Sequence, residues 1–147
     1  MKTLSLFLFI SIILTSNIVM SQSSIEPDKR LKAIYSETDL IRMQTHNPET
    51  IDLLNFQLDN SWFIAGEEIL PKVQDAPYLY YLDKETGQAS DIRVEQIDPN
   101  NLNVAEFYIE KDFNRHVFYK VGNSGTIIGF YSTKEFTKIY NNYKSRQ

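Results

Sequence analysis

Pairs of carboxylates are the groups in this sequence best suited to catalysis. Glu67 is followed by Glu68, and a single lysine separates Glu110 from Asp112. A glycoside hydrolase needs two carboxylates several ångström apart around a sugar, where one donates a proton and the other acts as base or nucleophile. Because no cleft-forming pattern flanks either pair, we assign no catalytic residue. A hydrolase acting through carboxylates stays open as the alternative function.

The segment over residues 122–125 resembles the Gly-Asp-Ser-Gly sequence around the nucleophile of chymotrypsin-like proteases, and His46 precedes it in the chain. Asn123 replaces the acidic residue, however, and the chain is too short for the two barrels that carry such a triad. Glycine and asparagine tolerate positive φ, so these four residues suit a tight turn between antiparallel strands. We predict a hairpin turn at this position and no nucleophile.

Metal ligands are sparse. The chain has no cysteine and two histidines, His46 and His116, neither of which has a histidine or carboxylate two or four residues later. Asp98, Asn100 and Asn103 offer oxygen atoms to calcium, but their loop lacks the glycine and the closing glutamate of an EF-hand. We therefore predict no metal site and no cofactor.

Tyrosines are the best candidates for a binding surface. Neighbouring residues of a strand point to opposite faces, so the tyrosines of the strand-like runs cannot all lie in one core. Tyrosine provides a large contact area at a small cost in entropy, and it is frequent in binding surfaces. We assign a binding role to Tyr78, Tyr80, Tyr108, Tyr119 and Tyr131. A role as simple cover of a sheet next to solvent is the open alternative.

Acidic and basic residues are unevenly distributed. Residues 47–110 contain 13 acidic side chains and three basic ones, whereas residues 111–147 contain seven basic and two acidic ones. The two regions either guide a partner or neutralise each other. Arg115 and Lys120 are interleaved with aromatic residues, as in proteins that stack the bases of single-stranded nucleic acids on aromatic side chains. The net charge of −4 gives no general attraction for phosphate, so we predict no nucleic-acid partner.

The first 21 residues are typical of a secretory signal. Lys2 provides the positive start, the run from Leu4 to Val19 is mainly apolar, and small residues precede a predicted cleavage after Ser21. An uncleaved anchor is the alternative, since a spanning helix needs about 17–25 apolar residues. A mature start at Ser-Gln resembles exported proteins of the Bacteroidota. We expect a periplasmic or extracellular protein with no stable membrane anchor after cleavage.

Two helices are predicted after a flexible lead-in over residues 22–34, which is polar and contains Pro27. Ser36 and Asp39 form a variant capping box for a short helix that ends near His46. Asn47 and Pro48 suit the start of a second helix over residues 48–59. Apolar residues lie on two sides of this second helix, so we expect it in the core.

The next part of the chain reads as strands. Six runs, over residues 62–65, 78–82, 92–97, 104–110, 116–121 and 126–131, are separated by turn-forming residues. The loop over residues 83–87 and the turn over 122–125 favour antiparallel pairing. Ala105, Phe107 and Ile109 alternate with polar residues, which predicts one buried and one solvated face.

The chain ends in a third predicted helix. Ser132 and Glu135 form a capping box, and Phe136, Ile139 and Tyr140 start an apolar stripe that continues to Tyr143. We expect this stripe to pack on the sheet. Gly129, among bulky neighbours in the preceding strand, predicts a close approach of the helix or of an aromatic ring.

These elements predict an α+β fold. Residues 35–147 form a single domain with an antiparallel sheet of about five or six strands, on which two N-terminal helices and one C-terminal helix pack. The composition, 42% hydrophobic and 23% charged, is that of a globular domain. We predict an exported, non-catalytic binding or accessory protein of the bacterial cell envelope, whose partner is another envelope protein. The alternative is a small hydrolase acting on envelope sugars or peptides. The oligomeric state is left open.

Overall fold

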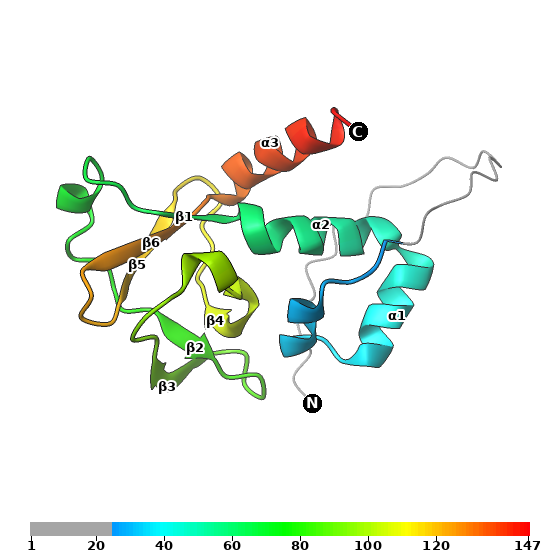
Figure 1. Ribbon diagram of the computed structural model, residues 1–147, viewed down its shortest axis with the longest axis horizontal. Helices are drawn as coiled ribbons and strands as arrows, with labels where there is room; N and C mark the ends of the chain where they lie inside the picture. The colour runs from blue at the N-terminus through cyan, green and yellow to red at the C-terminus, as the bar shows by residue number, and fades with distance from the viewer. Residues whose placement is uncertain (1–24) are drawn as a thin grey trace.

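The structure is a computed structural model that describes residues 25–147 (Figure 1). The predicted signal peptide and residues 22–24 lie outside the described residues. The described part combines helices and antiparallel strands, so the α+β class is confirmed. The helices are α1 (Glu37–His46), α2 (Pro48–Asn60) and α3 (Thr133–Lys144), and the strands are β1 (Trp62–Ile64), β2 (Tyr80–Leu82), β3 (Ala89–Arg93), β4 (Phe107–Tyr108), β5 (Val117–Val121) and β6 (Thr126–Phe130).

Part of the segment that was expected to be a flexible lead-in is packed against the domain. Residues Lys29–Ala33 form a 3-10 helix, η1, whose residue Leu31 is buried in the core. The backbone N–H of Asp28 donates to Asn55 Oδ1 of α2 at 2.8 Å. The Arg30 guanidinium bridges Asp28 and Asp59 at 2.9 and 2.6 Å. These long-range contacts attach residues 28–33 to α2, and local sequence patterns do not reveal them.

Helices α1 and α2 begin and end close to the predicted positions. Ser36 Oγ accepts a hydrogen bond from the Asp39 backbone N–H at 3.1 Å, as the capping box predicts. Asn47 stands at the N-cap of α2, but its side chain makes no capping hydrogen bond. Its backbone N–H instead donates to Met43 O of α1 at 2.7 Å. Asn47 is therefore the junction of two helices, and Pro48 starts the second.

The strands form two sheets, which corrects the prediction of a single sheet of five or six strands. One sheet has the order β1-β6-β5 and the other β3-β2-β4, and both are antiparallel. Tyr80 of β2 pairs with Arg93 of β3 on one side and with Tyr108 of β4 on the other. Because both edges of β2 are occupied, only the residues before it reach β5. There Tyr78 and Lys120 form a single parallel bridge between the sheets.

The predicted strand over residues 104–110 is reduced to β4. Residues Val104–Glu106 form a 3-10 helix, because the Asn103 side chain accepts a hydrogen bond from Ala105 N at 3.3 Å. The predicted strand over 92–97 lies earlier in the chain, as β3. The hairpin turn over residues 122–125 is confirmed: Gly122 and Gly125 have φ values of 48° and 74°. Ser124 Oγ donates to Val121 O at 2.7 Å, so Ser124 belongs to the turn.

Helix α3 packs on α2, which corrects the prediction that it packs on the sheet (Figure 1). The Phe56 ring of α2 lies 6.0 Å from the ring of Phe136, 5.4 Å from Tyr140 and 4.4 Å from Tyr143. No residue of α3 is fully buried. Phe56 lies on the side of α2 away from Ile51 and offers an aromatic surface that the predicted stripe of α3 covers. Helix α1 also packs on α2.

Candidate functional site

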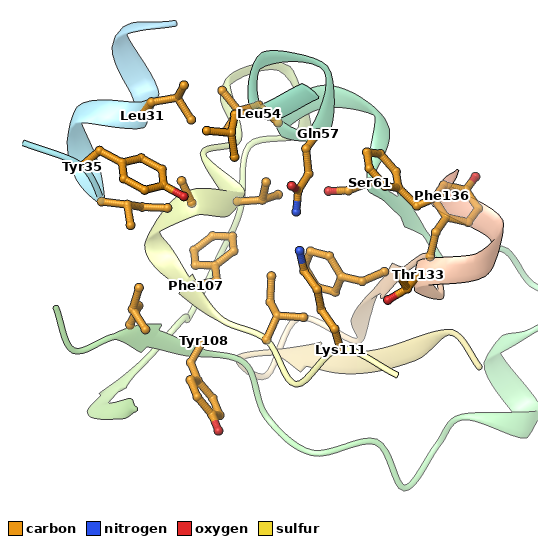
Figure 2. A pocket seen from close by; sticks show the side chains of 18 of the residues that line it. Leu31, Tyr35, Leu54, Gln57, Ser61, Phe107, Tyr108, Lys111, Thr133 and Phe136 are labelled. Atoms are coloured by element: carbon orange, nitrogen blue, oxygen red, sulfur yellow. The ribbon is translucent and has the colours of Figure 1, made fainter. Parts of the chain in front are cut away.

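A pocket with a volume of about 410 Å³ lies where η1, α2, β4 and the start of α3 meet (Figure 2). Small-molecule sites in proteins have volumes of roughly 300–1,000 Å³. We name this hollow the Lys111 pocket, after the one charged residue among residues 25–147 that lines it. Its walls are mainly aliphatic and aromatic, and they include Leu31, Leu54, Leu58, Phe107, Phe130 and Phe136.

Several elements position these walls. Leu54 and Leu58 are four residues apart on α2 and so share one face of the helix. The contacts of η1 with α2 bring Leu31 to the same pocket. Phe107 is held by its pairing with Tyr81 of β2, and the two rings lie 5.6 Å apart. The pocket thus forms where the helical part of the domain meets the second sheet.

The Lys111 amine points into this pocket (Figure 2). The side chain is exposed, because the pocket is open to solvent. Protein atoms nevertheless limit the hydration of the amine, and this desolvation lowers the pKa of Lys111 from its ordinary value. None of the ion pairs among residues 25–147 includes Lys111. The pocket therefore holds a cation without a carboxylate partner from the described chain.

Uncharged polar side chains also face the Lys111 pocket. Gln57 and Ser61 come from α2 and its C-cap, Tyr35 follows η1, and Thr133 begins α3. Figure 2 shows the Gln57 amide and the Lys111 amine pointing toward one another across the hollow. Burial raises the pKa of Tyr35, so its phenol stays neutral. Apolar walls with a few convergent polar groups are typical of a small-molecule site.

The structure brings two of the five predicted binding tyrosines to this pocket. Tyr108 and Tyr131 line it, whereas Tyr80 lies half-buried in β2. Tyr119 is buried, and its hydroxyl accepts a hydrogen bond from the Glu110 backbone N–H at 2.9 Å. Tyr119 thus fills the core and contributes to no accessible surface.

Tyr78 belongs to a different surface. It is 37% exposed, and the Arg93 guanidinium lies 4.6 Å and the Lys120 amine 5.8 Å from the centre of its ring. Both distances allow a cation–π interaction. Tyr78 and Lys120 also line a second hollow of about 540 Å³ beside the hairpin turn.

The predicted carboxylate pairs do not meet in the Lys111 pocket. Glu67 lines the second hollow. Glu110 accepts a hydrogen bond from the Tyr108 hydroxyl at 3.2 Å. Asp112 accepts hydrogen bonds from the backbone N–H groups of Asn114 and Arg115, which lower the pKa of this carboxyl. Asp112 therefore stabilises a turn.

The histidines have structural surroundings as well. His116 Nδ1 accepts a hydrogen bond from the backbone N–H of Ser132, the N-cap of α3, at 3.0 Å. His46 ends α1. Within residues 25–147 no three histidine or carboxylate side chains gather at metal-binding distance.

No family model, curated protein or solved structure matches this chain. Its function therefore has to be inferred from its own geometry. Within the described residues, no helix combines the length and the apolar character needed to cross a membrane.

Lys111 was not singled out from the sequence, although a signal for it exists. Ala105, Phe107 and Ile109 alternate on the face predicted to be buried, and the next position in this period of two is Lys111. The residues flanking the lysine, Glu110 and Asp112, suggest instead a solvated loop. The period-of-two pattern predicts the direction of the Lys111 side chain correctly, and the charged neighbours do not.

Proposed function

We propose that this chain is an exported, non-catalytic binding protein of the bacterial cell envelope, and that its ligand is a small, mainly apolar molecule held in the Lys111 pocket. The observation that carries the proposal is the combination of apolar walls with the convergent polar groups of Lys111, Gln57 and Ser61. Such a site gains affinity from the burial of apolar surface and selectivity from a few polar contacts.

The alternative, a small hydrolase acting on envelope sugars or peptides, draws no support from this pocket. Within the part of the chain that the structure describes, no aspartate, glutamate or histidine lines it. Hydrolysis through carboxylates needs two such groups beside the substrate. A binding role requires only the walls and the polar groups that are present.

A contact with another envelope protein is a second part of the proposal, and Tyr78 carries it. Tyrosine and arginine are both enriched among the residues that contribute most to binding at protein interfaces, and the Arg93 guanidinium lies over the exposed Tyr78 ring. Capture from envelope extract with the wild type and Tyr78→Ala tests this part. A stoichiometric partner retained by the wild type and lost from the variant supports it, and equal recovery with both contradicts it.

Binding of a neutral fluorescent probe tests the pocket. N-phenyl-1-naphthylamine should bind the wild type saturably at one site. Leu54→Trp places a larger side chain in the wall and should weaken binding at least about tenfold, because the added ring occupies the ligand volume. Leu53→Trp is the matched control, since Leu53 lies on the same helix but outside the pocket wall.

Two results contradict this proposal. One is the absence of saturable probe binding to the folded wild type. The other is equal weakening by Leu54→Trp and Leu53→Trp, which places the probe elsewhere on the molecule. Far-ultraviolet circular dichroism of each variant shows that the comparison is made between folded proteins.

A further inference from the structure

We infer that the ligand of the Lys111 pocket carries a single carboxylate, which pairs with the Lys111 amine while an apolar tail fills the rest of the hollow. This inference rests on the proposed binding function and specifies the chemical class of the ligand. It follows from the charge of the pocket, from its hydrogen-bond donors and from the position of its apolar walls.

The charge of the pocket favours a monoanion. Among the described residues, Lys111 is the one charged side chain of the wall, and no carboxylate pairs with it. A neutral ligand would desolvate the ammonium group without compensation, and a cationic ligand would add repulsion. A dianion would leave one of its own charges unpaired in apolar surroundings. One negative charge matches the site.

The donors of the pocket suit a carboxylate. A carboxylate accepts about four hydrogen bonds, whereas an ammonium group donates three and a primary amide two. The Lys111 amine and the Gln57 amide point toward one another across the hollow, so a small anionic group between them meets donors from both sides (Figure 2). Ser61, whose residue is largely buried, adds a hydroxyl to the same wall.

The apolar walls set the place of the tail. Figure 2 shows Leu31, Leu54 and the Tyr35 ring together on one side of the Lys111–Gln57 pair. All three side chains line the pocket. A ligand whose carboxylate meets Lys111 can therefore place a hydrocarbon chain against this side. The arrangement fits a medium-chain fatty acid or another apolar monocarboxylate.

Binding of such a ligand is linked to protonation of Lys111. Desolvation of the amine by the surrounding protein atoms lowers the pKa of Lys111, and a bound carboxylate favours the charged amine. Desolvation raises the pKa of two other wall residues, Tyr35 and Tyr108, so neither phenol carries a charge at neutral pH. Binding of a carboxylate should therefore take up protons in the pH range where Lys111 is partly neutral, and binding of an alcohol should not.

Displacement of the neutral probe by matched eight-carbon compounds tests the inference. Octanoate should displace the probe from the wild type at a concentration at least about tenfold lower than 1-octanol, because a hydrogen bond between charged groups is stronger than one between a charged group and a neutral hydroxyl. Octylamine should be the weakest competitor. Lys111→Met should remove the preference for octanoate, and Lys111→Arg should keep part of it.

Lys134→Met is the matched control, since Lys134 is an exposed residue of α3 outside the pocket wall. It should keep the full preference for octanoate. Urea unfolding of each variant shows whether it is folded, and Lys111→Arg tests the charge in case Lys111→Met alters the packing.

The outcomes separate the two proposals. If the probe does not bind the folded wild type, the proposed function fails. If the probe binds and octanoate competes no better than 1-octanol, the carboxylate inference is overturned and the proposed function stands. If Lys111→Met keeps the wild-type preference for octanoate, Lys111 is not the group that recognises the ligand, and the inference is overturned as well.

Discussion

The hydroxyl of Tyr140 in α3 donates a hydrogen bond to Asp52 Oδ2 of α2 at 3.0 Å. Asp52 is only 8% exposed, and the same oxygen accepts a second hydrogen bond from Lys144 Nζ at 3.0 Å. A nearly buried carboxylate is thus compensated by two groups of the C-terminal helix. This cluster attaches α3 to α2 and explains why α3 lies beside a helix.

Tyr140→Phe removes one hydrogen bond from this cluster and keeps the ring. The expected loss in the free energy of unfolding is about 1–2 kcal/mol, because a buried carboxylate loses one of its donors. Urea unfolding at pH 7 measures the change. A loss below about 0.3 kcal/mol would show that water replaces the hydroxyl at no cost.

The same variant should alter alkaline unfolding. Burial and the hydrogen bond to Asp52 raise the pKa of Tyr140 above its ordinary value of 10.0. The folded chain therefore holds this proton more tightly than the unfolded chain, so its contribution to stability is complete below pH 10.0 and declines above it. Urea midpoints measured from pH 8 to 11 should fall less steeply for Tyr140→Phe than for the wild type. Parallel curves contradict the assignment.

Lys111→Met should stabilise the folded protein at neutral pH. The pKa of Lys111 is lowered, so between this pKa and the ordinary value of 10.5 the unfolded chain binds more protons. The wild type therefore gains stability as the pH rises through this range. The advantage of Lys111→Met should be largest near pH 7 and disappear above pH 10.5. Thermal melts as a function of pH test this, with Lys134→Met as control.

Gly129→Val should destabilise β6. A Cβ atom at Gly129 would lie 2.5 Å from Phe63 Cζ and 3.0 Å from Phe118 Cε1, so both rings would have to move. The predicted close approach of an aromatic ring is therefore confirmed, and we expect a loss of about 1–3 kcal/mol from overpacking. In a Phe63→Ala background the same substitution should cost clearly less, because the first ring is absent. Equal costs in both backgrounds would contradict this explanation.

Phe56→Ala should destabilise the domain more than Phe136→Ala, because Phe56 contacts three rings of α3. For Phe136, which is only half-buried, we expect a loss of about 1–3 kcal/mol, below the roughly 3–5 kcal/mol typical of a buried phenylalanine. Lys138→Ala breaks an exposed ion pair with Glu135 and should cost under about 0.5 kcal/mol. Urea unfolding should give the largest loss in the free energy of unfolding for Phe56→Ala, a smaller loss for Phe136→Ala and the smallest for Lys138→Ala. A different order of these losses would contradict the packing of α3 on α2.

Local features of this protein could be predicted because their interactions lie within a few residues of the chain. Ser36 caps α1 through Asp39, and Ser132 caps α3 by accepting a hydrogen bond from Glu135 N at 3.2 Å. The turn over residues 122–125 contains two glycines with positive φ. In each case the interacting residues lie within three positions of each other in the sequence.

The candidate site could be predicted only in part. Tyr108 and Tyr131 line the Lys111 pocket, whereas Tyr78, Tyr80 and Tyr119 do not. The rule that strand residues alternate between faces places a tyrosine on one face or the other. It does not state what lies opposite that face, and this decides whether the side chain fills a core, lines a pocket or meets solvent.

The tertiary structure decided the features that depend on distant partners. The division into two sheets follows from the pairing of Tyr80 with both Arg93 and Tyr108, and the position of α3 follows from Phe56 and Asp52. The Lys111 pocket likewise requires η1, α2, β4 and α3 together. Sequence periodicity specifies which face of an element is apolar. Which distant surface covers that face depends on how all elements of the chain pack together.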